Sequence, residues 1–281
     1  MGRLYDQMKM DLELNYSPKT VSCYLHWMLQ FVRHNGRSPV EMGDEEIRNY
    51  LHHLIKVKEA SQSSINQAYS AMKFFYATTL EKEWNGTKIP RIKNSKKLPV
   101  VLSMEEVEAL LESLDNLKHR AILTTIYSGG LRVGEATRLK VSHLDSQRMT
   151  IRVEDGKGSK DRYTLLGHRT LALLRDYWKA YRPDEWLFPG AKPGEPISVS
   201  SVQSVFKKAL DKTGIRKKAS VHTLRHSFAT HLLESGTDLY YIQRLLGHTT
   251  ANTTSIYLHI TGKDIARVRS PIDLFKKESG R

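Results

Sequence analysis

Several features that mark large classes of protein are missing from this 281-residue sequence. It contains no apolar run close to the roughly 20 residues that a membrane-spanning helix needs. Its first residues, Met1-Gly-Arg-Leu-Tyr-Asp, lack the apolar core of a secretion signal. The single cysteine, Cys23, cannot form a disulfide within the chain and suits a reducing compartment. We therefore expect a protein of the cytoplasm that has no membrane partner.

The signatures of two common cofactor types are missing as well. No Gly-x-x-x-x-Gly-Lys-Ser/Thr loop, which would cradle nucleotide phosphates, occurs in the sequence. His222 and His226 have the i, i+4 spacing of helical zinc ligands, and His231 follows, but no glutamate comes directly after the first histidine and no cysteine cluster accompanies them. We therefore expect an activity that needs no cofactor, neither ATP nor a metal ion.

What the sequence has in excess is positive charge. Lysine and arginine number 44 against 30 aspartate and glutamate residues, which gives a net charge of +14 and a pI near 9.7. A polyanion is the natural partner of such a protein. An anionic membrane is the alternative, but no long basic amphipathic anchor and no lipidation motif supports it. The balance favours nucleic acid.

Residues 1–84 have the pattern of a compact helical domain. A serine followed by proline combines an N-cap hydroxyl with the residue best suited to the first helical position, and apolar residues then recur at helical spacing as far as Gly36. The three expected helix starts are Ser17-Pro18, Asp44, and either Ser61 or Ser63. Residues 85–100 carry prolines, a glycine and basic residues with little periodicity, which predicts an inter-domain linker.

Residues 101–281 are expected to form a second domain. Ser103 and Glu106 have the spacing of a capping box that opens a helix. Residues 149–153 alternate as a strand does, and residues 162–166 can pair with them across a glycine-containing hairpin tip. The expected fold class is therefore mainly α with a small β-sheet insert (α+β).

The second domain holds residues suited to phosphodiester chemistry. Cleaving a phosphodiester without a metal needs fixed cations at the non-bridging oxygens, an in-line nucleophile and an acid for the departing oxygen. Arginine suits the first task because its planar guanidinium is always charged and matches two oxygens. The candidates, in chain order, are Arg132, Glu135, Lys157, His222, Arg225, His248 and Tyr257.

Each of the first three candidates is ambiguous when taken alone. Arg132 follows a Gly-Gly turn at an expected helix start, where phosphate binds well, but a surface arginine would fit there equally. Glu135 lies on the same helix face and would either orient a catalytic partner or simply be exposed. Lys157, between two glycines at a hairpin tip, would either reach into a DNA groove or serve solubility.

The last four candidates are equally ambiguous one by one. His222 and Arg225 are spaced i, i+3 at a helix start, so both point one way, opposite an apolar stripe. His248 directly follows a glycine that ends a helix and would suit capping of its carbonyls. Tyr257 is one of 13 tyrosines, most of which are expected to pack.

In combination, the order and spacing of these residues resemble the tyrosine recombinase (phage-integrase) family over almost the whole chain. The clearest local marks are the stretch from His222 to Gly236 and Gly247-His248 followed nine residues later by Tyr257. The closest likeness is to integron-integrase-type enzymes, but residues 181–189 leave no room for the extra segment that those carry. The resemblance therefore implies a site-specific recombinase or integrase of another mobile element, with the chromosome-dimer-resolving recombinases as a near alternative.

The resemblance also implies a role for each candidate. Tyr257 would attack the scissile phosphate and form a 3′-phosphotyrosyl link, His222 would assist proton transfer, and Lys157 would protonate the leaving 5′ oxygen. The residues that would hold the phosphate are Arg132, Arg225 and His248, with Glu135 supporting the pocket.

The implied partners are double-stranded DNA recombination sites and further copies of the chain. Four protomers would assemble on two DNA segments, each clamped between an N-terminal helical, SAM-like domain and a C-terminal catalytic domain. The apolar tail, with Ile272, Leu274 and Phe275, would dock on a neighbouring protomer or act as an intramolecular lid. DNA-bending accessory proteins are a further expected partner, and the site of action would be the nucleoid.

Two other activities remain compatible with the sequence. A type IB topoisomerase-like enzyme would use the same pocket to nick and reseal one strand without exchange. A DNA-binding accessory protein would keep the fold with an inactive pocket, although every signature position is filled here.

Overall fold

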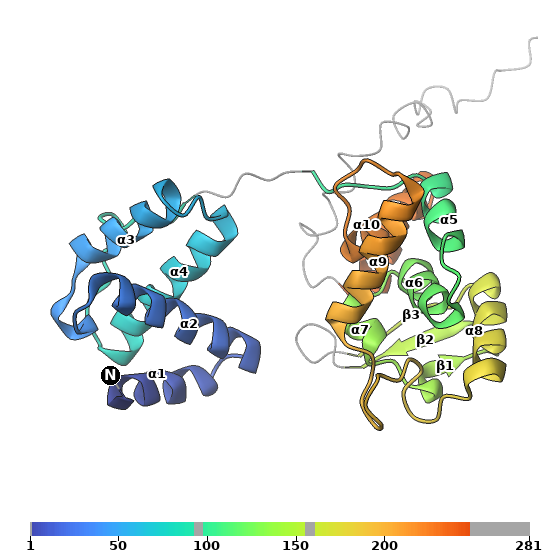
Figure 1. Ribbon diagram of the computed structural model, residues 1–281, viewed down its shortest axis with the longest axis horizontal. Coiled ribbons are helices and arrows are strands. Elements are labelled where there is room, and N and C mark those ends of the chain that lie inside the picture. The colour runs from blue at the N-terminus through green and yellow to red at the C-terminus, as the bar shows by residue number, and fades with distance from the viewer. Residues whose placement is uncertain (1, 93–97, 155–160, 248–281) are drawn as a thin grey trace, which may run out of the picture. The chain divides into compact units, whose positions relative to one another are not determined.

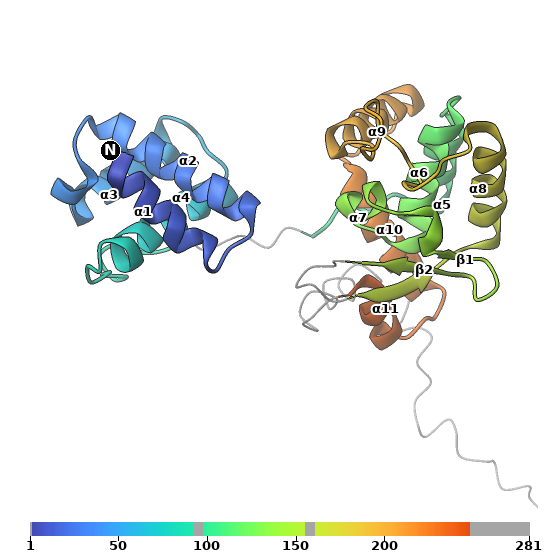
Figure 2. The same ribbon diagram turned by 90° about the horizontal axis from the view of Figure 1, so that it is seen from below.

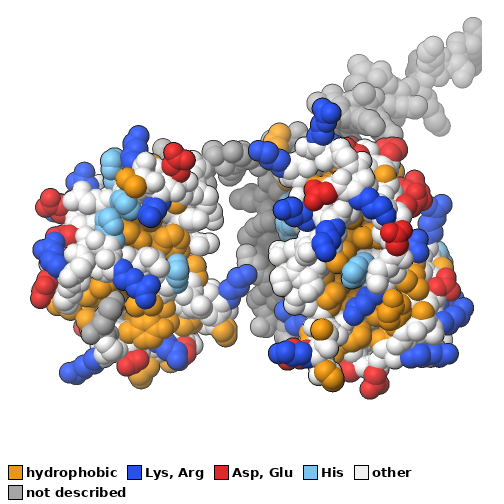
Figure 3. Space-filling model, viewed as in Figure 1, with side chains coloured by type: hydrophobic (Ala, Val, Ile, Leu, Met, Phe, Trp, Pro, Cys, Tyr) orange, Lys and Arg blue, Asp and Glu red, His pale blue; other side chains and the backbone are white. Residues whose placement is uncertain are grey.

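The computed structural model describes residues 2–92, 98–154 and 161–247. The chain divides into two compact units, Met1–Lys96 and Lys97–Arg281 (Figure 1). Lysine and arginine side chains are spread over both units on the face drawn in Figure 3. No helix in the described ranges is long and apolar enough to cross a membrane. The predicted division into 1–84, 85–100 and 101–281 stays a prediction, but Ile89 is fully buried in the core of the first unit.

The first unit is a bundle of short helices. Ser17 caps the second helix by accepting from the amide of Thr20, and Gly36 ends it in the left-handed conformation, φ 64°, as predicted. Ser61 caps the fourth helix, as predicted, whereas the third begins one residue earlier than expected, because Gly43 and not Asp44 is its N-cap residue. The helices are α1 (Gly2–Glu13), α2 (Pro18–Asn35), α3 (Asp44–Lys56) and α4 (Gln62–Phe74), with the short 3-10 helix η1 (Pro39–Glu41) and the π-helix η2 (Phe75–Thr79).

The second unit combines several helices with one small sheet, as the predicted fold class requires. Its elements are α5 (Met104–Glu112), α6 (Leu117–Gly129), α7 (Val133–Thr137), η3 (Val141–His143), β1 (Leu144–Asp145), β2 (Thr150–Val153), β3 (Arg162–Leu165), α8 (His168–Tyr181), α9 (Val199–Thr213), α10 (Val221–Glu234) and α11 (Leu239–Leu246). The sheet is antiparallel in the order β1-β2-β3. The capping box at Ser103 and the pairing of the two predicted strands are confirmed.

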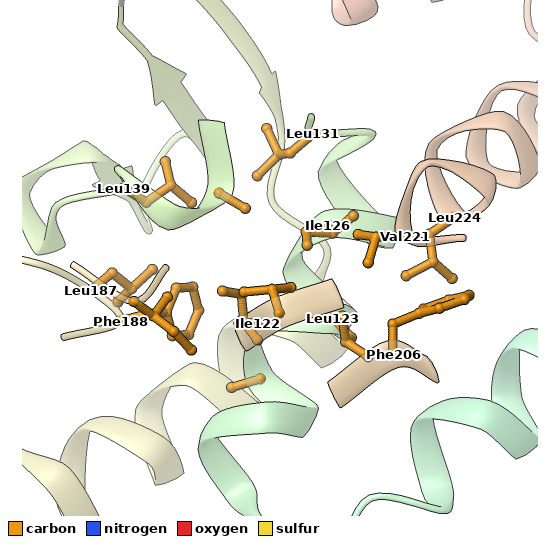
Figure 4. Packing of buried hydrophobic residues seen from close by; sticks show 14 of the residues in the cluster. Ile122, Leu123, Ile126, Leu131, Leu139, Leu187, Phe188, Phe206, Val221 and Leu224 are labelled. Atoms are coloured by element: carbon orange, nitrogen blue, oxygen red, sulfur yellow. The ribbon is translucent and has the colours of Figure 1, made fainter. Parts of the chain in front are cut away.

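The centre of the second unit is α6, whose apolar residues are buried on several faces. Leu123 and Ile126 lie beside Phe206 of α9 and Val221 of α10, whereas Ile122 lies on the side of Phe188 (Figure 4). A separate apolar cluster joins α10 to α11, which packs along β3 (Figure 2). This packing brings the end of α6, the start of α10 and the end of α11 to one place.

The turn after α6 is fixed by a close approach to α10. Gly130 has φ 58°, in the left-handed region that favours glycine. A Cβ at this position would lie 2.4 Å from the ring of Phe228 on α10. Only glycine fits both the conformation and the space, so the turn that leads into Arg132 is held against α10.

Candidate active site

Arg132 is the N-cap residue of α7, at the tight turn into a helix that the sequence predicts. Its backbone amide donates to Oε2 of Glu135 at 2.7 Å, and its Nη1 donates to Oε1 at 2.7 Å. Both the backbone and the guanidinium of Arg132 are therefore held by one carboxylate. The side chain of Arg132 remains partly open to solvent, 28% exposed, so a ligand can reach it.

Glu135 is a buried anion rather than an exposed surface residue, with 4% of its side chain accessible. Burial alone raises the pKa of this carboxyl, but the hydrogen bonds and charge of Arg162, with the hydrogen bonds from Arg132, outweigh burial and lower the pKa to about 2. A carboxylate that stays ionised can organise cations around it. Besides Arg132 and Arg162, a third arginine lies near Glu135: Nη1 of Arg225 is 3.9 Å from Oε2 of Glu135.

Arg225 is carried by α10 and is almost completely buried, with 1% of its side chain accessible. Its Nη1 donates to the carbonyl of Gly130 at 2.6 Å, and its Nη2 donates to the carbonyl of Leu246 at 2.7 Å. One guanidinium thus ties the turn before Arg132 to the end of α11. Buried arginine normally requires such partners, because its charge cannot be neutralised by deprotonation.

His222 opens α10 three residues before Arg225, as predicted. The residue is exposed, yet partial loss of hydration around its ring, with the charges of Arg225 and Arg132, lowers its pKa. Its ring lies 4.6 Å from that of His226 in a T-shaped contact, and burial together with His222 and Arg225 lowers the pKa of His226 to about 4. A neutral imidazole at His222 can accept a proton near pH 7.

The structure reveals one residue of this cluster that the sequence reasoning missed. Arg162 begins β3, and its guanidinium forms a two-point contact with Glu135: Nη1 to Oε1 at 2.9 Å and Nη2 to Oε2 at 2.7 Å. The alternation of the predicted strand places Arg162 and Thr164 on one face, and the structure shows that Thr164 is buried. An arginine on the inward face of a strand must be paired.

The structure therefore brings together four of the predicted site residues, Arg132, Glu135, His222 and Arg225, from α7 and α10. The other three, Lys157, His248 and Tyr257, lie outside the described residues. Within the described ranges, no group of three or more histidine, cysteine, aspartate or glutamate side chains could hold a metal ion.

The sequence of residues 100–263, more than half of the chain, matches the model of the phage integrase family. The chain belongs to this family of tyrosine recombinases. Residues 3–86 match the N-terminal SAM-like domain of phage integrases. This recombinase is thus a site-specific DNA-recombining enzyme with a SAM-like domain followed by an integrase catalytic domain.

Relatives of this tyrosine recombinase align along nearly its whole length. A protein of Sinorhizobium fredii (strain NBRC 101917 / NGR234), y4qK, provisionally named an integrase/recombinase, is 43% identical over 99% of this chain and 91% of its own. Tyrosine recombinase XerC of Pelotomaculum thermopropionicum is 31% identical over 92% of each chain. A lambda integrase tetramer bound to a Holliday junction shares the fold, with a TM-score of 0.72 and 19% identity over 89% of this chain and 77% of that one.

Proposed function

We propose that this recombinase cuts and rejoins double-stranded DNA through a 3′-phosphotyrosyl intermediate and serves the integration, excision or resolution of a mobile element. The observation that carries the proposal is the buried carboxylate of Glu135, which holds Arg132 at 2.7 Å while Arg225 lies 3.9 Å away. Guanidinium groups from two different elements are kept together by the protein itself. Such preorganised cations stabilise the charge that develops on a phosphate in the transition state.

The proposed first step passes the scissile phosphate from DNA to the protein. The phenolic oxygen of Tyr257 attacks phosphorus, the bond from phosphorus to the 5′ oxygen breaks, and a 3′-phosphotyrosyl bond forms. Lys157 gives a proton to the departing 5′ oxygen, and His222 accepts the proton of the phenol. The lowered pKa of His222 supports this role, because only the neutral ring can accept a proton.

The phosphate-binding role falls to Arg132, Arg225 and His248, which would neutralise its non-bridging oxygens. Glu135 would orient the two arginines without reacting. Attack by the 5′ hydroxyl of another strand then regenerates a phosphodiester and frees Tyr257. One phosphoester bond is exchanged for another at each step, so the reaction needs no energy-supplying cofactor.

The proposed assembly is a tetramer on two DNA sites, supported by the shared fold with the lambda integrase tetramer on its Holliday junction. Each protomer would clamp DNA between a helical domain, residues 1–84, and a catalytic domain, residues 101–281, joined by the basic linker 85–100. The C-terminal tail would dock on a neighbour, and DNA-bending proteins would assist. Because its substrate is DNA, we expect the enzyme to work at the nucleoid in the cytoplasm.

Resolution of chromosome dimers is a second candidate, favoured by the 31% identity to a XerC recombinase. The two functions differ in the DNA site that becomes attached to the protein. A site at the end of a mobile element would support the first function, and a single chromosomal site elsewhere would support the second.

A trapping experiment tests the proposed reaction. Wild-type protein and Tyr257→Phe would be expressed in cells carrying the gene's native flanking DNA, lysed under denaturing conditions, and the protein-linked DNA sequenced. We expect a discrete adduct with the wild type and none with Tyr257→Phe. Tyr241→Phe is a matched control, because Tyr241 is an exposed tyrosine of α11 and its loss should leave the adduct unchanged.

Two outcomes would contradict the proposal. Sequence-specific binding by both proteins with no adduct, even on a nicked substrate that traps cleavage, would favour an accessory DNA-binding protein. Nicking and closing that relaxes supercoiled DNA without recombinants would favour a type IB topoisomerase-like activity.

A further inference from the structure

Arg162 connects the sheet to the cluster of arginines through a two-point contact. Its two terminal nitrogens donate to the two oxygens of Glu135 at 2.9 and 2.7 Å. Its Nε donates to the carbonyl of Leu245 at 2.9 Å. With 8% of the Arg162 side chain and 4% of Glu135 accessible, this is a buried ion pair, and solvent screens it little.

The charges in this cluster show what Arg162 contributes. Glu135 carries one negative charge and contacts three arginines, Arg132, Arg162 and Arg225, so the four side chains sum to +2. Without Arg162 the sum would fall to +1, and the buried carboxylate would be left to the two arginines that the proposed function assigns to DNA phosphate. A scissile phosphate would then compete with Glu135 for them.

The second contact of Arg162 lies at the end of α11. Leu245 and Leu246 are its last two residues, and their carbonyls accept hydrogen bonds from Arg162 and Arg225 respectively. Gly247 follows with φ 63°, and a Cβ there would lie 2.7 Å from Cδ of Arg162. The two arginines therefore fix the point from which the chain continues to His248 and Tyr257.

We propose that Arg162 is a positioning residue for DNA strand cleavage. It neutralises Glu135 so that the positive charge of Arg132 and Arg225 can act on the phosphate, and it anchors the end of α11, after which the chain continues to Tyr257. This inference rests on the proposed function, since it concerns the same pocket. It goes further by assigning a task to a residue of the sheet.

The experiment measures single-turnover formation of the covalent adduct on a nicked DNA substrate, together with DNA affinity. We expect Arg162→Gln to lower the cleavage rate about 100-fold, the size of effect that slight misplacement of catalytic groups produces, with DNA affinity changed less than about twofold. Arg162→Lys should lose less, because it keeps the charge but not the two-point geometry. Arg152→Gln is the matched control: Arg152 is on the neighbouring strand, exposed, and paired with Asp161.

Two further readouts separate positioning from a merely structural role. On a substrate whose scissile phosphate is replaced by a neutral methylphosphonate, the defect of Arg162→Gln should shrink at least about tenfold, because less charge must be neutralised. Adding Glu135→Gln to Arg162→Gln should recover part of the lost rate on natural DNA, because no buried carboxylate then competes for Arg132. A defect caused only by misfolding would be the same on both substrates, and adding Glu135→Gln would not reduce it.

The inference fails if Arg162→Gln cleaves natural DNA like the wild type. It also fails if the variants at Arg162, including Arg162→Lys, show the same defect on both substrates. Wild-type protein on the natural substrate serves as the reference. If it forms no adduct at all, the proposed function fails instead, and the two failures are distinguishable.

Discussion

The two units of this recombinase stabilise themselves in different ways. In the described part of the first unit, the buried polar side chains are Asn66 and Thr79, and no charged side chain is buried. The second unit buries Glu135 and Arg225, together with His143 and His231. His231 is itself fully engaged, with its ring nitrogens 2.8 Å from the hydroxyl of Tyr127 and 3.0 Å from the carbonyl of Leu102.

This difference in buried charge is consistent with the proposed position of the active site in the second unit. Removing a charge from water costs several kcal/mol unless partners compensate. A scaffold that only holds its shape has no need of buried ions, and the first unit has none among its described residues. The second unit places Glu135 and Arg225 where α7, α10, α11 and β3 meet, which is the pocket proposed above for DNA cleavage.

The largest expected effect comes from removing the most deeply buried arginine. Arg225→Ala should lower the rate of covalent adduct formation by about 1,000-fold, because it removes a cation proposed to stabilise the transition state. It also leaves the carbonyls of Gly130 and Leu246 without their donor. Single-turnover cleavage of a nicked substrate measures the effect. An unchanged cleavage rate would show that Arg225 does not stabilise the transition state.

Neutralising the central carboxylate should mainly affect stability. Glu135→Gln leaves three buried or partly buried arginines without their anion, and we expect the second unit to lose about 3 kcal/mol. Arg37→Gln, which breaks an exposed 2.7 Å pair with Glu46 in the first unit, should cost about 0.5 kcal/mol. Hydrogen exchange of peptides from each unit measures both losses of stability. Equal losses would contradict the difference proposed between the two units.

The stability of the first unit should depend on its apolar core rather than on buried charges. Met72, fully buried on α4, packs in the core cluster, and Met72→Ala should destabilise this unit by about 2 to 3 kcal/mol through lost burial and a cavity. Hydrogen exchange should increase in α2 and α4 but not in α6 or α10. The adduct-forming rate on prebound DNA should stay near the wild-type value, and a large decrease would show that the two units are coupled.

The smallest expected effect is a dependence of stability on pH. The pKa of His226 is about 4 in the folded protein, below the ordinary 6.5. The unfolded chain therefore binds a proton first, and stability should decrease as pH falls from about 6.5 towards 4. Glu135, lowered from 4.5 to about 2, contributes only below about pH 5. Thermal unfolding from pH 7.5 to 5 measures the slope of stability against pH. The variant His226→Gln should flatten this slope, whereas His52→Gln, at an exposed position of α3, is the control.

Features set by neighbouring residues could be predicted from the sequence. The helix starts at Ser17, Ser61 and Ser103 depend on a hydroxyl three residues before the amide that it caps. The pairing of β2 with β3 follows from alternation on either side of a short turn. Helix α1 escaped prediction, because no capping side chain marks its start, although Met8 and Leu12 are buried in the core.

Features set by distant residues could not be predicted. Nothing near Glu135 in the sequence indicates that Arg162, 27 positions away, would supply its strongest partner. The carbonyls that Arg225 binds come from Gly130 and Leu246, which only packing brings together. The family resemblance selected Arg132, His222 and Arg225 by their order in the chain, but the contacts that hold the two arginines depend on the folded core.

The contact between Gly130 and Phe228 also has a consequence for how such enzymes diversify. A side chain at position 130 would collide with the aromatic ring, so Gly130 cannot be replaced without moving the ring or the turn that carries Arg132. Related sequences should therefore keep glycine at position 130, because its left-handed backbone also favours glycine. A mutant library aimed at new DNA targets would retain more active members if it kept both fixed and randomised exposed residues elsewhere.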